Sequence, residues 1–220
     1  MLVIGAALAA GLGAQTPAAA SGAEAGRVTY ARSFKGSVPA FVQIAISQDG
    51  AATATVREHD ADAPQTLRFT ASTAAVQDIF AQAAVLHEFT HPKLEAKQKV
   101  AYSGDKMLAF DDANHHSSQQ FNFTTVAPAA ALEARFERMA TTAVDRLELE
   151  RAMRFQPLNT LGVLEQIEQD LSAGRLGAPQ MIEPDLEAAA ANPALMDAVH
   201  HHAAGILKSL HAAQPSNNLE

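Results

Sequence analysis

Cysteine and tryptophan are absent from this sequence, and tyrosine occurs only twice. The lack of cysteine removes disulfides, thiolate metal sites, a catalytic thiol and the lipid-bearing cysteine of bacterial lipoproteins. So few aromatic side chains also argue against a ring-stacking platform for carbohydrate. Basic residues are scarce, with 16 Lys and Arg against 24 Asp and Glu, a formal charge of −8. Because no cluster of Lys and Arg makes a local positive field, we expect no nucleic-acid partner.

Motifs of several common enzyme classes are missing as well. The sequence contains no G-x-G-x-x-G, and Ser103 lies outside any G-x-S-x-G elbow. Phe34-Lys35-Gly36-Ser37 has neither a Walker pattern nor a following helix. A serine hydrolase or nucleotide-binding function therefore has no support.

What the chain does contain is typical of a globular protein. Hydrophobic residues make up 48% of its 220 residues and charged residues 18%, so a disordered, collagen-like or coiled-coil chain is excluded. A chain of this length can bury a substantial core, either as one domain or as a sheet with a helical appendage.

The N-terminus is typical of an export signal. An apolar run over residues 2–12 is followed by small residues, with Ala18-Ala19-Ala20 as an A-x-A cleavage site. We therefore predict a signal peptide over 1–20, with cleavage between residues 20 and 26, and an exported protein, periplasmic or secreted. The run is too short for a spanning helix, so we expect no transmembrane segment in the mature chain. No Lys or Arg precedes Arg27, which leaves open a start further upstream, or a disordered Ala- and Gly-rich leader on a cytoplasmic protein.

Period-two alternation predicts strands over much of residues 27–126. Val42, Ile44 and Ile46 share one strand face, Gln48-Asp49-Gly50 supplies a turn, and Ala52 to Arg57 returns. Further strands are expected in the following ranges: 28–34, 66–69, 100–102, 107–110 and 121–125. One helix, at about 72–90, interrupts them, with Ser72 as its N-cap and an apolar stripe that includes His87.

Beyond Pro128 the period is 3.6 and predicts about four helices. The first ends at Pro157, and the last has Asn192 as cap and Pro193 at its first position. The fold class is therefore α+β: an antiparallel sheet of about 6–7 short strands with one packed helix, followed by a helical region. The predicted organisation is a sheet-plus-helix region over 27–126, helices over 127–213 packed on or beside it, and a disordered tail over 214–220.

One string specifies a chemistry, His87-Glu88-Phe89-Thr90-His91. In His-Glu-x-x-His sites the two histidines lie one helical turn apart and bind Zn²⁺, while the glutamate acts as the base. The string resembles gluzincin and metzincin signatures at those positions. An acid such as Glu133 would complete the site.

The residues after the string weaken the zinc hypothesis. Pro92 disfavours the α conformation at His91, so His91 is expected at or beyond the helix end. Leu94 and Lys97 occupy the positions where a metzincin has glycine and a third histidine. Strands follow where a gluzincin would place its ligand helix. The alternative interpretation is a partly buried His87 beside a polar helix end.

Two other histidine groups have simple structural explanations. Asp111, Asp112, Asn114 and His115-His116 are typical of a hairpin loop, although they would also suit a metal. His200-His201-His202 on a helix point about 100° apart and cannot chelate as i,i+4 pairs do.

The segment Phe34-Lys35-Gly36-Ser37-Val38-Pro39, continuing to Ile44 and followed by an Asp-Gly hairpin, resembles an uncharacterised family of exported bacterial proteins. This resemblance implies export and an α+β fold, and it assigns no catalytic residue or metal site. We therefore expect a non-catalytic exported protein that binds an unknown protein or small ligand without a cofactor. The alternative is a zinc-dependent hydrolase using His87, Glu88 and His91.

Overall fold

The computed structural model describes residues 26–90 and 93–213 and has the α+β fold that the sequence predicts. The predicted signal peptide and C-terminal tail lie outside the described residues, as do His91 and Pro92. Within the described part, no helix is both long enough and apolar enough to span a membrane.

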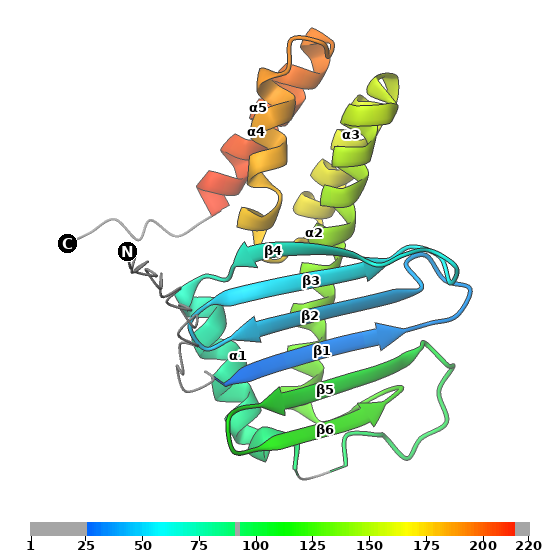
Figure 1. Cartoon of the computed structure of the whole chain (residues 1–220), viewed down its shortest axis with the longest axis vertical. Coiled ribbons are helices and arrows are strands. Elements are labelled where there is room, and N and C mark those ends of the chain that lie inside the picture. Colours follow the sequence, from blue (N-terminus) through cyan, green and yellow to red (C-terminus); the bar gives the residue numbers. More distant parts are fainter. Residues whose placement is uncertain (1–25, 91–92, 214–220) are drawn as a thin grey trace, which may run out of the picture.

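A single antiparallel sheet of six strands forms the base of the molecule (Figure 1). Its spatial order is β4-β3-β2-β1-β5-β6. The strands are β1 (Arg27–Ser33), β2 (Phe41–Ser47), β3 (Ala51–Arg57), β4 (Gln65–Thr70), β5 (Asp105–Asp111) and β6 (His116–Phe121). The first four strands form a meander, and the β5–β6 hairpin adds to the other side of β1.

Eight segments of helix accompany the sheet in the described residues, five α-helices and three short 3-10 turns. The α-helices are α1 (Thr73–Val85), α2 (Ala127–Phe155), α3 (Thr160–Ser172), α4 (Glu183–Ala191) and α5 (Asp197–Ala213). The 3-10 turns are η1 (His87–Phe89), η2 (Pro157–Asn159) and η3 (Pro179–Met181).

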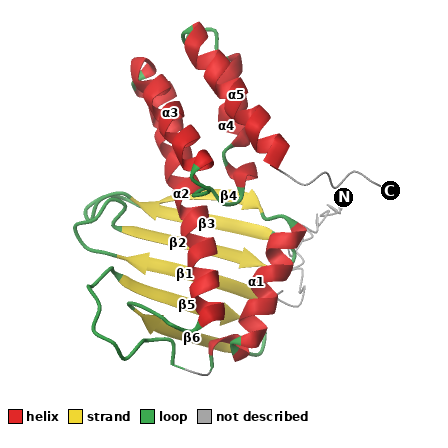
Figure 2. Cartoon of the chain, turned by 180° about the vertical axis from the view of Figure 1, so that it is seen from behind, coloured by secondary structure: helices red, strands yellow, loops and turns green. Residues whose placement is uncertain are grey.

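Both α1 and α2 cross the same face of the sheet, as Figure 2 shows. Alternation in the strands explains why: Val42, Ile44 and Ile46 are fully buried under these helices, while Gln43 and Ala45 point the other way. In Figure 1 the opposite face is turned to the viewer, and no described helix or loop covers it.

Helix α2 links two apolar cores. Its first half packs on the sheet through residues such as Leu132 and Phe136, whose ring stacks on Tyr30 with centroids 5.6 Å apart. Its last turns project past β4 and pack with α3, α4 and α5 around Leu149, Leu164 and Ile206. We call this second unit the helical extension.

The expected elements differ from the observed ones at several ends. Helix α1 begins after Ser72, whose Oγ accepts from the backbone N of Ala75 at 3.3 Å, but it ends at Val85 rather than near residue 90. Residues 100–102 form no strand. Helix α5 begins at Asp197, because Asn192 caps a turn instead, with its Oδ1 accepting from the N of Ala194 at 3.0 Å.

The last strand was also misplaced: β6 spans His116–Phe121 rather than 121–125. Its polar run of Ser, Gln and His suggested a loop. At a sheet edge such a sequence is tolerated, because only Ser117 and Phe121 need to be buried.

Candidate functional site

The described residues of the His87–His91 string do not continue helix α1. After Val85 the chain turns, and His87, Glu88 and Phe89 have φ angles of 50°, 53° and 63°. Three successive L-residues in the left-handed region cost roughly 1–2 kcal/mol each. Neighbouring contacts must therefore hold this turn in place.

Burial and two hydroxyl groups provide that support. Leu86 and Phe89 are 2% and 1% exposed, so the turn seats the Phe89 ring in the core beside the end of α1. The Thr90 Oγ1 donates to the His87 carbonyl at 2.6 Å, and the Ser117 hydroxyl of β6 donates to the Glu88 carbonyl. The turn is thus tied to the far edge of the sheet.

The zinc hypothesis required two imidazoles one turn apart on a helix and a carboxylate close by. The expected helix through residue 90 is wrong, and His87 is exposed rather than on the buried stripe. Glu133 has its Oε1 2.7 Å from the Nζ of Lys106. Within the described residues, His87, Glu88 and Glu133 form no common ligand group. His91 lies outside those residues.

The other two histidine groups match their structural interpretations. Asp112 Oδ1 accepts from the backbone N of both Asn114 and His115 at 2.7 Å, as a tight hairpin loop requires. His116 bonds to Asp111.

On α5 the three imidazoles have different partners. They are the Asn192 carbonyl for His200, the Asp197 carbonyl for His201 and the Glu168 carboxylate for His202. The run therefore does not converge on one point.

Sequence reasoning missed one group of metal-type ligands, at the start of the β3–β4 loop. One ligand atom each from Glu58, His59 and Asp62 lies within 4.8 Å of the others. These charges already have partners: Glu58 pairs with Arg151 of α2, and His59 Nδ1 is 2.8 Å from Asp62 Oδ2. The hydrogen bond from Arg151 is the main cause that lowers the pKa of Glu58. The group is therefore explained as an ion-pair cluster that fixes the loop to α2.

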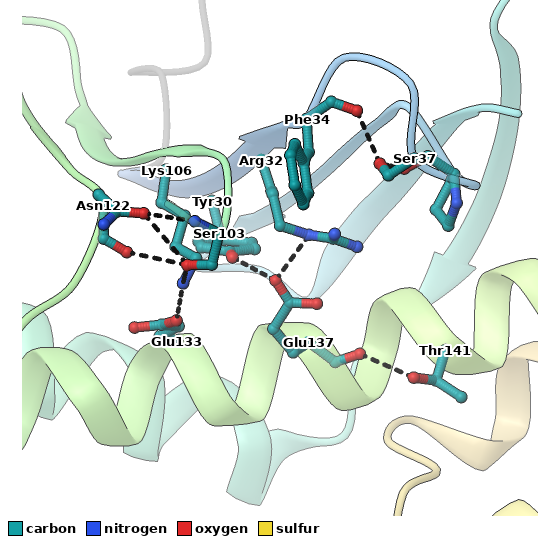
Figure 3. A network of polar contacts seen from close by, with 11 residues as sticks. Tyr30, Arg32, Phe34, Ser37, Ser103, Lys106, Asn122, Glu133, Glu137 and Thr141 are labelled. Atoms are coloured by element: carbon teal, nitrogen blue, oxygen red, sulfur yellow. Dashed lines mark hydrogen bonds and ion pairs between the residues drawn. The ribbon is translucent and has the colours of Figure 1, made fainter. Parts of the chain in front are cut away.

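A polar network between the sheet and α2 is shown in Figure 3. The Tyr30 hydroxyl donates to Glu137 Oε1 at 2.5 Å, and Arg32 Nε lies 2.9 Å from the same oxygen as an ion pair. Burial, followed by the charge of Glu137, raises the pKa of Tyr30. Lys106 reaches Glu133 one helical turn away on α2.

Tyr30 and Lys106 donate hydrogen bonds to these carboxylates, whereas Arg32 Nε is paired with Glu137 by charge and makes no hydrogen bond. Each charge that enters the covered side of the sheet meets a carboxylate of α2, which fixes the helix in register with β1 and β5. We therefore assign the network a structural role.

A second polar layer separates the two apolar cores. Asp145 of α2 is 5% exposed, and its Oδ2 has no hydrogen-bond partner among the described residues. Burial, and then the charge of Asp170, raises the pKa of Asp145 to about 7. Asp170 itself accepts from Arg175 and Gln166. We therefore expect the stability of the junction between sheet and helical extension to depend on pH near neutrality.

The uncovered face of the sheet has the most open geometry. Strand register places a continuous row of residues across all six strands, with one side chain from each strand. In order from β4 to β6 the row is Arg68, Thr53, Ala45, Thr29, Ala109 and Ser118. All six line a surface hollow of about 730 Å³. We call this row the transverse groove.

The neighbouring rows form the walls of the groove. One wall contains Ser47, Arg27, Asp111 and His116, and the other contains Gln43 and Met107. Between them Thr29 is only 8% exposed, although no described element covers this face. In the register its immediate neighbours are Ala45 and Ala109. The groove floor therefore places a hydroxyl group between two small side chains.

Two cations flank the groove. Arg27 and Arg68 are exposed, and neither forms an ion pair within residues 26–90 and 93–213. Across the sheet their strands are three spacings apart, about 14 Å, and Arg27 lies two residues further along the strand direction than the row of Arg68. In a chain of net charge −8, free guanidinium groups on an uncovered face favour a negatively charged ligand there.

No protein-family model matches this sequence, and a search of curated proteins found nothing similar. Assignment of a function therefore rests on the residues themselves. The sequence analysis did not predict the groove, although the small residues that alternate with large apolar ones in the strands are a signal for it.

Proposed function

We propose that this protein is a non-catalytic binding protein, exported as its N-terminal run suggests, and that the uncovered sheet face is its binding surface. One observation carries the proposal: the groove combines a surface hollow, hydroxyl groups on its floor and two exposed arginines that form no ion pair among the described residues. A face that served only folding would not need any of these.

The composition of the two sheet faces supports this proposal. Residues that fold the protein are on the covered side, where the core extends from Val28 to Phe121. Small side chains on the other side leave the sheet surface accessible across all six strands. The volume of the hollow, about 730 Å³, lies in the range of about 300–1,000 Å³ that is typical of ligand sites.

The chemistry on this face favours binding over catalysis. Its side chains are hydroxyls, amides and arginines, together with an Asp111–His116 pair that lies on the wall at the sheet edge. No described nucleophile there contacts a base. Hydrogen-bond donors and fixed positive charges recognise a ligand without transforming it.

A thermal-shift screen of acidic metabolites, peptides and oligosaccharides tests the proposal. We expect at least one anionic class to raise the melting temperature of the wild type but not that of Ala45→Phe, which fills the groove floor. The matched control Ala204→Phe, on an exposed position of α5, should respond like the wild type. A ligand that stabilises Ala45→Phe equally, or the absence of any stabilising class, would contradict the proposal.

A further inference from the structure

We propose that the transverse groove binds an extended acidic peptide that crosses the strands, with its carboxylates beside Arg68. This inference rests on the proposed binding function and specifies the class of ligand.

The floor places hydroxyl groups on every second strand. Thr53 is on β3, Thr29 on β1 and Ser118 on β6, while Ala45 and Ala109 fill the strands between them. Two strand spacings are about 9.4–9.8 Å. A ligand that lies along the groove therefore meets a hydroxyl at that interval.

A peptide in the polyproline II conformation has a matching repeat. It has three residues per turn and a rise of about 3.1 Å, so equivalent backbone carbonyls recur about every 9.3 Å. These carbonyls are free to accept hydrogen bonds, because the conformation makes none internally. Hydroxyls of Thr53, Thr29 and Ser118 can donate to successive equivalent carbonyls. Their span, about 19 Å, accommodates roughly six residues.

The free charges orient such a peptide. Arg68 ends the groove on β4 and has no carboxylate partner among the described residues. On the wall that contains it, Arg27 is next to Asp111 in the register, and Asp111 is bonded to His116. The β4 end is therefore the more positive one, and the acidic residues of the peptide should lie there.

Binding of three labelled peptides, followed by fluorescence anisotropy, tests this inference. The first alternates alanine and proline and ends in two glutamates. The second ends in two glutamines with an amidated terminus, and the third replaces every proline of the first with glycine. We expect the first to bind at least about fivefold more tightly than either of the others, because charge-assisted contacts and preorganisation are each worth about 1 kcal/mol or more.

Variants locate the contacts on the groove. Arg68→Gln should remove the preference for the glutamate peptide over the glutamine peptide. Thr29→Val should weaken binding of both by roughly threefold to tenfold, as expected for one lost hydrogen bond. Ser118→Ala also removes one floor hydroxyl, and because Ser118 is exposed on the edge strand β6, this substitution should not disturb folding. Arg154→Gln, at the far tip of α2, is the control and should bind like the wild type.

Several outcomes would overturn the inference. They are equal binding of the proline and glycine peptides, retention of the glutamate preference in Arg68→Gln, or no peptide binding by wild-type protein. If the thermal-shift screen still finds a ligand that Ala45→Phe blocks, the binding function survives and only the peptide class fails. If Ala45→Phe blocks nothing, both fail.

Discussion

The two faces of the sheet come from the same strands, yet they differ in nearly every property. One is built from large aliphatic and aromatic side chains beneath α1 and α2, and the few charges on it are paired with carboxylates of α2. The other has small residues, hydroxyl groups and arginines that form no ion pair among the described residues. Packing against α1 and α2 determines the residues of the covered face. The residues of the uncovered face are free of that constraint and can serve binding.

The two faces should differ most in how much stability is lost when a side chain is truncated, as two neighbouring residues of β2 can show. Ile44 is fully buried on the covered face, so Ile44→Ala should cost about 2–5 kcal/mol of unfolding free energy. Gln43→Ala, next to it on the open face, should change stability by no more than about 0.5 kcal/mol. Urea denaturation measures both. Similar losses for the two variants would remove the distinction between the faces.

Removal of a positive charge should lower the unfolding free energy more on the covered face than on the open face. Lys106→Met leaves Glu133 without its partner in a largely buried position, and we expect a loss of about 1–3 kcal/mol. Arg68→Gln removes an exposed, unpaired charge and should be neutral within about 0.5 kcal/mol. The same denaturation assay tests the pair, and a neutral Lys106→Met would contradict the structural role of the network.

The junction with the helical extension should respond to pH. Asp145 has a pKa raised from 3.8 to about 7, so the native state holds this proton more tightly than the unfolded chain. That contribution to stability is complete below about pH 4 and is lost as the pH rises through about 7. Asp145→Asn should therefore raise the melting temperature by about 2–8 °C at pH 8 and have little effect at pH 4.

Calorimetry at the two pH values checks this, with Glu187→Gln on the exposed side of α4 as a control that should show no such dependence. A pH-independent effect of Asp145→Asn would show that its carboxyl is not the titrating group.

The smallest expected effect on stability is that of Glu88→Gly. Its sign distinguishes a left-handed turn from a right-handed helix at this position. In the left-handed turn at φ 53°, Glu88→Gly relieves backbone strain and should stabilise the protein by up to about 1 kcal/mol. In a right-handed zinc-binding helix the same change would destabilise by about 1 kcal/mol. Chemical denaturation decides between the two, and metal analysis of the same preparations should show no stoichiometric zinc in the wild type.

Local patterns predicted much of the fold. Alternation at Val42, Ile44 and Ile46 identified the buried sheet face, and Ser72 marked the start of α1. Pro157 correctly marked the end of the long helix. In these cases the deciding interactions lie within a few residues of each other in the sequence.

Features decided by distant contacts could not be predicted in this way. The end of α1 depends on Phe89 entering the core and on Ser117 reaching the Glu88 carbonyl. Similarly, the groove exists because β5 pairs with β1, which aligns Ala109 with Thr29 across a separation of 80 residues. Nothing local in the sequence specifies that register.

Mapping of a bound ligand on the backbone amides by NMR decides whether the uncovered sheet face is the binding surface. With the acidic proline-containing peptide, or with any ligand from the thermal-shift screen, we expect the largest shift changes around Thr53, Ala45, Thr29 and Ala109. Changes confined to the helical extension or to the surface of α1, with the amides of the sheet unaffected, would contradict it.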